Sequence, residues 1–127
     1  SETIIRHISI PSEVIDIDTG AFNSCKQLRC VEIDNNSKLE NIDNITFSFT
    51  SVKFITIPQQ VLKSVLLYFC ECGEIQMIEI TNGISTDSID ENLFDNFAKE
   101  FKNRNNNDFN GIIMIQANTI IYNNSSH

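Results

Sequence analysis

Four cysteines and two histidines are the side chains of this sequence best suited to covalent or metal chemistry. The pair Cys70-Glu-Cys72 has one residue between its thiols, whereas zinc ligand pairs usually have about two to four. Cys25 and Cys30 do not supply a second pair with that spacing. Neither histidine is accompanied by a nucleophile and an acid that the sequence pattern would bring together. We therefore predict neither a metal site nor a catalytic triad.

Carboxylates are the other groups that could do chemistry, because acidic residues outnumber basic ones by 17 to 9. The segment Asp16-Ile-Asp18-Thr-Gly20 begins like a calcium-binding loop. Its twelfth position is Gln27, however, where such a loop needs a bidentate acid, so we interpret the two aspartates as solvated turn residues. No other pair of acids has sequence neighbours that favour general acid–base catalysis. The sequence indicates no enzyme and no cofactor.

Length and charge limit the classes of partner. The chain has 127 residues, of which 41% are hydrophobic, and this is enough for a packed core in a single domain over residues 1–127. A net charge of −8 opposes binding to nucleic acid and to anionic membranes. No apolar run approaches the ~18 to 20 residues that span a bilayer, so we predict no membrane insertion. Because the chain begins at Ser1 without a methionine, we interpret it as a fragment of a longer protein, and a missing secretion signal then leaves its compartment open.

The elements that must position these side chains follow an internal repeat. The pattern apolar-x-x-apolar-x-apolar occurs four times, and the last members of successive copies are separated by 23, 24 and 23 residues. The copies are Ile5-x-x-Ile8-x-Ile10, Leu28-x-x-Val31-x-Ile33, Val52-x-x-Ile55-x-Ile57 and Ile75-x-x-Ile78-x-Ile80. The alternation of apolar residues within each copy predicts a half-buried strand. A fixed period in the twenties is typical of a solenoid, in which stacked units bury a core that no single unit could bury.

Large aromatic residues also recur between the predicted strands. Phe22, Phe47 and Phe69 each follow an aliphatic residue by eight positions, so we predict that their rings stack beneath the strands of the repeat rungs, residues 5–80. Apolar spacing predicts a short helix over residues 59–68 and a longer one over residues 90–102. Residues 81–127 are therefore expected to form a divergent capping unit that contains the longer helix. Its last strands follow the pattern Ile112-x-x-Ile115-x-Ala117.

The unit from Ile10 to Ile33 carries a family resemblance. It reads Ile-Pro-x-x-Val-x-x-Ile-x-x-x-Ala-Phe-x-x-Cys-x-x-Leu-x-x-Val-x-Ile, and it resembles the leucine-rich repeat of the bacterial surface-antigen (BspA-like) type. The resemblance implies an α/β solenoid with a parallel sheet of about four to six short strands and an irregular or short-helical convex side. Many members of that family are surface adhesion or recognition proteins. The resemblance thus implies a non-enzymatic protein-interaction module that is secreted or at the cell surface.

The repeat geometry also bears on the cysteines. Cys25 and Cys72 occupy equivalent places two units apart, and neighbouring strands of a sheet are about 4.8 Å apart. Their separation of about 10 Å exceeds the ~7 Å that a disulfide can bridge. We therefore predict four free thiols. Free thiols favour a cytoplasmic location, whereas the family resemblance favours the cell surface.

The outward face of the predicted sheet is the candidate binding site. With Val31 and Ile33 inward, the strand period of two turns Cys30 and Glu32 outward. One predicted column reads His7, Cys30, Phe54, Met77 and Met114, and the next reads Ser9, Glu32, Thr56, Glu79 and Gln116. From these columns we predict that a protein or cell-surface ligand is bound by Cys30, Glu32, Phe54, Thr56, Met77 and Glu79. One alternative is a purely structural cap or spacer of a longer repeat protein. In two others, a C-terminal segment folds back over the apolar column, or Phe54 packs sideways on a neighbouring rung.

Overall fold

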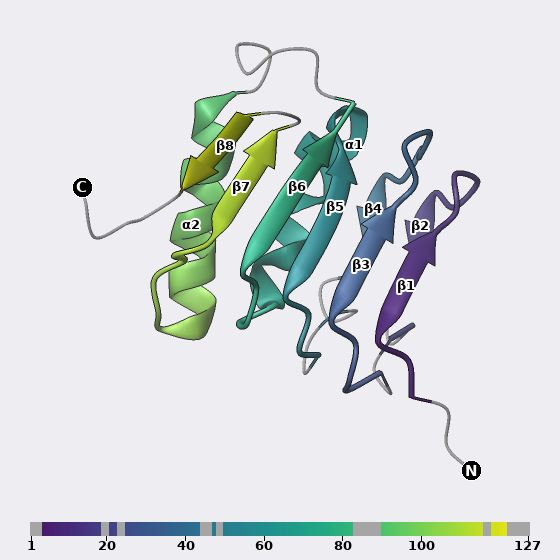
Figure 1. Cartoon of the computed structure of the whole chain (residues 1–127), viewed down its shortest axis with the longest axis horizontal. Coiled ribbons are helices and arrows are strands. Elements are labelled where there is room, and N and C mark those ends of the chain that lie inside the picture. The colour runs from purple at the N-terminus through teal and green to yellow at the C-terminus, as the bar shows by residue number, and fades with distance from the viewer. Residues whose placement is uncertain are drawn as a thin grey trace.

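Six strands form one sheet along the length of the molecule (Figure 1). The structure is a computed structural model, and it describes residues 4–18, 21–22, 25–43, 47, 50–82, 90–115 and 118–121. In sheet order the strands are β1 (His7–Ile10), β3 (Cys30–Ile33), β5 (Phe54–Pro58), β6 (Met77–Thr81), β7 (Ile112–Ile115) and β8 (Asn118–Ile121). Neighbours from β1 to β7 pair in parallel, and β8 pairs antiparallel with β7. The predicted parallel sheet is confirmed.

The four repeat copies lie in the register that their sequences predict. Ile8 pairs with Val31, Val31 with Ile55, and Ile55 with Ile78. Val31, Ile55 and Ile78 are fully buried, whereas Ile8 on the edge strand is half-buried. Apolar residues at the same position in successive copies therefore form continuous rows under the sheet, as in a solenoid.

The predicted aromatic stack lies beneath this sheet. The ring centroids of Phe22 and Phe47 are 5.4 Å apart, and those of Phe47 and Phe69 are 5.0 Å apart. Both pairs are stacked, and the central ring of Phe47 is fully buried. Phe22, which has one stacked neighbour, is only half-buried.

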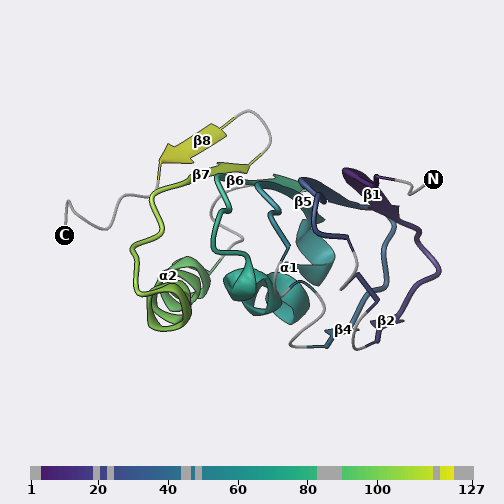
Figure 2. The same cartoon turned by 90° about the horizontal axis from the view of Figure 1, so that it is seen from below.

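The side of the molecule beneath the sheet contains a second, two-stranded sheet in addition to the helices (Figure 2). Its strands β2 (Asp16–Ile17) and β4 (Asn41–Ile42) pair in parallel, and Ile17 faces Ile42 in the register. The side-chain amide of Asn41 donates a hydrogen bond of 3.0 Å to the carboxylate of Asp16. This small sheet was not predicted, because two-residue strands carry no periodic pattern that a sequence could show.

Two predicted helices are present with shifted ends. The first consists of α1 (Gln59–Val65) and the 3-10 helix η1 (Leu66–Glu71), where one helix over residues 59–68 was expected. The second, α2 (Glu91–Asn105), begins directly after Asp90, whose carboxylate accepts a hydrogen bond of 3.0 Å from the Asn92 backbone N–H. An aspartate at this position satisfies one of the free N–H groups of the first turn.

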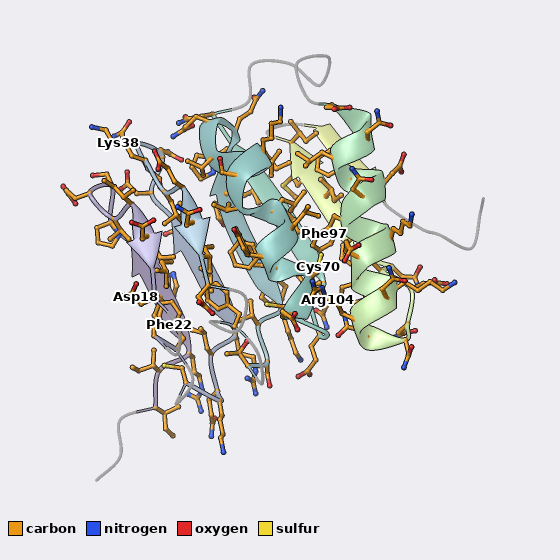
Figure 3. All side chains as sticks on the ribbon, turned by 180° about the vertical axis from the view of Figure 1, so that it is seen from behind. Asp18, Phe22, Lys38, Cys70, Phe97 and Arg104 are labelled. Carbon is orange, nitrogen blue, oxygen red and sulfur yellow. The ribbon has the colours of Figure 1, made fainter. Side chains whose placement is uncertain are left out.

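Helix α2 is fixed to η1 by polar contacts at one end and by a thiol contact near its middle (Figure 3). The Cys70 sulfur lies 3.6 Å from the backbone oxygen of Phe97. The Asn105 side chain donates a hydrogen bond of 2.9 Å to the Cys70 carbonyl, and Arg104 pairs with Glu71. This packing makes residues 90–115 part of the same body as the repeat rungs.

The predicted position of β7 in the repeat pattern is wrong by two residues. Ile113 pairs with Ile78, and Ile115 pairs with Ile80, so Ile113 rather than Ile115 continues the buried row. Ile112, predicted to be inward, is exposed, and the predicted inward residue Ala117 lies outside the described residues.

The physical reason for this shift is an aromatic residue that precedes the strand. Phe109 is fully buried, and its ring contacts Phe97 and Phe101 edge-on at centroid distances of 5.2 and 5.6 Å. It packs into the core against α2, one residue before the position that Ile75 holds in the preceding rung. A Cβ atom at Gly111 would lie 2.7 Å from the carbonyl oxygen of Gln76, so glycine is needed for the chain to pass close to the neighbouring rung.

Candidate functional site

The outer face of the main sheet is the side away from the helices (Figure 2). Along β1 to β6, no helix or strand of the described chain covers this face, whereas β8 stands on the outer side of β7. Parallel pairing without a register slip brings equivalent outward residues of successive strands next to one another. The outer face is therefore a set of side-chain rows that run across the strands.

Two such rows contain all six of the predicted site residues. The apolar row consists of His7, Cys30, Phe54, Met77 and Ile112, which are partners in the strand register. The polar row consists of Ser9, Glu32, Thr56, Glu79 and Met114. The predicted columns were correct on β1 to β6 and wrong on β7, where Met114 belongs to the polar row and Gln116 lies outside the described residues. Sequence reasoning therefore missed Ile112 as a member of the outer face.

The apolar row exposes large hydrophobic side chains to solvent. Phe54 is 39% exposed and Ile112 is 38% exposed, while Cys30 and Met77 are half-buried between their neighbours. Strands about 4.8 Å apart bring such side chains into mutual contact, so each partly shields the next. The row is thus a continuous ridge of apolar surface rather than a set of isolated residues.

The polar row borders a hollow of about 390 Å³ at the end where the strands exit. Glu32 is exposed, and neither Glu32 nor Glu79 has an ion pair or side-chain hydrogen bond to any described residue. The lining adds the carboxylate of Asp34 and the hydroxyl of Thr81, and no described lysine, arginine or histidine contributes to it. The hollow therefore has negative charge that the described part of the chain does not neutralise.

Hydrogen bonds between rungs fix the rim of this hollow. The backbone oxygen of Asn35 accepts hydrogen bonds from the side-chain amides of Gln60, at 2.5 Å, and Asn82, at 2.7 Å. The Thr81 hydroxyl donates a hydrogen bond of 2.7 Å to the Asn35 side-chain oxygen. These bonds connect the turn after β3 with α1 and with the end of β6. The rim is consequently held by three successive units.

Basic residues occupy the opposite ends of the same strands. The backbone N–H of Arg29 donates to the oxygen of Arg6, and that of Lys53 donates to the oxygen of Arg29, both at 2.8 Å. One basic residue therefore stands before each of the first three strands of the sheet. The outer face is consequently bordered by basic residues where the strands enter and by acids where they exit.

Two of the four cysteines, Cys70 and Cys72, are poor nucleophiles because they are buried. All four are free thiols. Burial raises the pKa of Cys70 to about 12 and that of Cys72 to about 12, so both are fully protonated near neutral pH. Burial and the nearby Glu32 carboxylate also raise the pKa of Cys30. Across the described residues, no group of three or more histidine, cysteine or acidic side chains could hold a metal ion.

A second hollow lies beneath the sheet, and it is lined by Asp16, Asp18 and Asp43 together with Tyr68. Asp43 belongs to the unit that follows the predicted turn aspartates, Asp16 and Asp18, and the repeat brings it next to them. Asn41, from the same unit as Asp43, donates a hydrogen bond to Asp16. Figure 3 shows Asp18 on this side of the molecule. Among the described residues that line it, no buried unpaired group points to a ligand, so the outer face remains the site with the stronger case for binding.

The rungs, the parallel sheet and the aromatic stack together define a solenoid of the leucine-rich repeat class. The sequence matches the family described as the BspA type leucine-rich repeat region, in six copies over residues 1–124, and the chain belongs to this family. No curated protein and no solved structure matches the chain. None of the helices in the described part of the chain is long and apolar enough to cross a membrane.

Proposed function

We propose that this chain is a non-enzymatic recognition module that binds a protein or a cell-surface component through the outer face of its sheet. The observation that carries the proposal is the apolar row, in which Phe54 stays exposed on the part of the face, β1 to β6, that no described helix or strand covers, and Ile112 is exposed at its end on β7. Interface centres are enriched in aromatic residues and methionine, and a charged rim surrounds them. The apolar row, with charged residues at both ends of its strands, has this composition.

The arrangement of the backbone also supports the proposal. The outward residues stand on paired strands whose inward neighbours, such as Ile55 and Ile78, are fully buried. A binding surface on such a rigid support loses little conformational entropy when a partner binds.

The second candidate is a structural spacer within a longer repeat array. It is favoured by the first rung, where Ile4, Ile5 and Ile15 are exposed beside the free edge of β1. Another repeat unit stacked on this end would cover these side chains and pair with the edge. The two roles make different surfaces functional, so an experiment can separate them.

Photo-crosslinking from single positions tests the proposal. A benzophenone amino acid replaces Thr56 on the outer face, Leu67 on η1 as a matched exposed control, or Ile5 at the first rung. Each full-chain variant is irradiated with cells or extract of the organism that produces the protein. We expect a discrete crosslinked partner from position 56 and none from position 67. Crosslinks confined to position 5 would favour the spacer, and equal crosslinking from positions 56 and 67 would contradict the proposal.

A further inference from the structure

We infer that the segment bound by the outer face is an amphipathic α-helix that lies across the strands, with lysine or arginine next to its apolar stripe. This inference rests on the proposed function and specifies the partner's chemistry. It follows from the spacing of the rows, from the unpaired carboxylates of the polar row and from the hollow beside them.

The spacing between strands fits a helix better than an extended chain. Successive members of the apolar row stand on strands about 4.8 Å apart, so Cys30 and Ile112, three strands apart in the register, are separated by about 14 Å. A helix places one side chain per turn of about 5.4 Å on a given face, and three turns span about 16 Å. An extended chain places alternate side chains about 6.6 Å apart, and three such steps span about 20 Å. Only the helix stays close to register across the whole row.

The charges of the polar row specify the helix flank. Glu32 and Glu79 both pair with Thr56, one on each side, so they stand about 9.6 Å apart. Two residues seven positions apart on a helix are separated by about 10.5 Å and lie on the same face. Lysine or arginine at these positions would meet both carboxylates, which have no ion-pair partner among the described residues. A partner with acidic residues on this flank would instead be repelled.

One helix is wide enough to cover both rows. The rows are two residues apart along each strand, which corresponds to about 6.6 Å, and a helix with its side chains is about 10 to 12 Å wide. The apolar stripe would lie on Phe54 and Met77, and the basic flank would lie over the hollow. That hollow of about 390 Å³ provides space for long side chains, and the hydroxyls of Thr56 and Thr81 can accept further hydrogen bonds from them.

Designed peptides of about 18 residues, long enough to form several helical turns, test the inference. The probe has leucines at positions i, i+4 and i+7 of one face and arginines spaced seven apart on the adjacent flank. One comparison peptide replaces the arginines with glutamate, and another keeps the leucines and arginines but has two prolines inside the helix. We expect the probe to bind the full chain and to become helical by circular dichroism. Both comparison peptides should bind about tenfold or more weakly.

Variants of the protein test where the probe peptide binds and whether general charge attraction alone explains the binding. The double variant Glu32→Gln/Glu79→Gln is matched by Glu40→Gln/Glu74→Gln, which changes the net charge equally at exposed positions away from the two rows. We expect the first pair to weaken probe binding about tenfold and the second pair to have little effect. Phe54→Ser should also abolish most of the binding, whereas Leu67→Ser should not.

Each other result overturns a defined part of the reasoning. If the two charge-matched double variants weakened binding equally, general electrostatic attraction rather than the polar row would explain the binding. Equal binding of the proline-containing peptide, with the same dependence on Phe54, would exclude a helix while the proposed binding face stands. If Phe54→Ser left binding unchanged, the outer face would not be the binding site. A dimer of the protein alone in sedimentation equilibrium that Phe54→Ser dissociates would assign the face to a second copy of this chain.

Discussion

The substitution Phe47→Ala tests the stacked aromatic core quantitatively. Phe47 is 1% exposed and contacts a ring on each side, at 5.4 Å to Phe22 and 5.0 Å to Phe69. Deletion of a buried phenylalanine side chain costs about 3 to 5 kcal/mol, and each aromatic pair contributes about 0.5 to 1.5 kcal/mol beyond its buried area. Because this substitution removes both pairs, we expect a loss of about 4 to 5 kcal/mol in the free energy of unfolding. Urea denaturation followed by circular dichroism measures it.

Two related variants keep this prediction testable if Phe47→Ala does not fold. Phe22 has one stacked neighbour and is half-buried, so Phe22→Ala should cost roughly half as much as Phe47→Ala. Phe47→Leu keeps most of the buried volume and should cost about 1 to 2 kcal/mol. A loss for Phe22→Ala that lies between the losses for Phe47→Leu and Phe47→Ala supports the order of the stack. A larger loss for Phe22→Ala than for Phe47→Ala would refute the stacking.

Four further predictions follow from the same structure. Given a partner, Phe54→Asp should weaken binding by more than ~2 kcal/mol and leave the thermal midpoint nearly unchanged, and an unfolded variant would show that Phe54 belongs to the core. In the folded protein at pH 8, Cys70 and Cys72 should resist thiol reagents because burial raises the pKa of each to about 12. After unfolding without reductant, all four thiols should react. Because the pKa of each thiol is raised in the folded state, both thiols favour folding below about pH 9. The free energy of unfolding should therefore fall between about pH 9 and 12, on the order of 1 kcal/mol per pH unit for each thiol. A rise over this range would contradict the burial. Asp90→Ala removes the carboxylate that accepts from the Asn92 N–H and should cost about 1 kcal/mol in urea denaturation, whereas Asp90→Asn should cost less.

The sequence was sufficient for the rungs because their information is periodic. A core residue in one unit, such as Val31, has an equivalent at a fixed distance in the next, and stacking in register requires that equivalence. The same argument placed Phe54 and Thr56 on the outer face, because parity within a strand determines which side a residue faces. Four strands and the outward side of six residues on them were therefore predictable from the sequence.

The last parallel strand was not predictable in the same way, because its core anchor changes type and position. Phe109 precedes Ile113 by four residues, where Ile75 precedes Ile78 by three. The sequence pattern that starts at Ile112 looks like a repeat copy, yet it shifts the register by two residues. The available signals were Gly111, which permits close approach to the preceding rung, and the aromatic cluster that Phe109 completes with α2. Both depend on contacts between segments that no single repeat contains.

The composition of the outer face is not explained by folding alone. Ile55 is buried, and its truncation to alanine would cost about 2 to 5 kcal/mol, whereas exposed positions usually change stability by less than about 0.5 kcal/mol. The outward positions of the same strands accept polar residues, as Glu32, Thr56 and Glu79 show. Cross-strand pairing of apolar residues contributes about 0.2 to 1 kcal/mol per pair, which is too little to require three large ones in a row. Exposed apolar side chains on adjacent strands, next to carboxylates without an ion-pair partner among the described residues, are therefore better explained by a bound partner than by the stability of the solenoid.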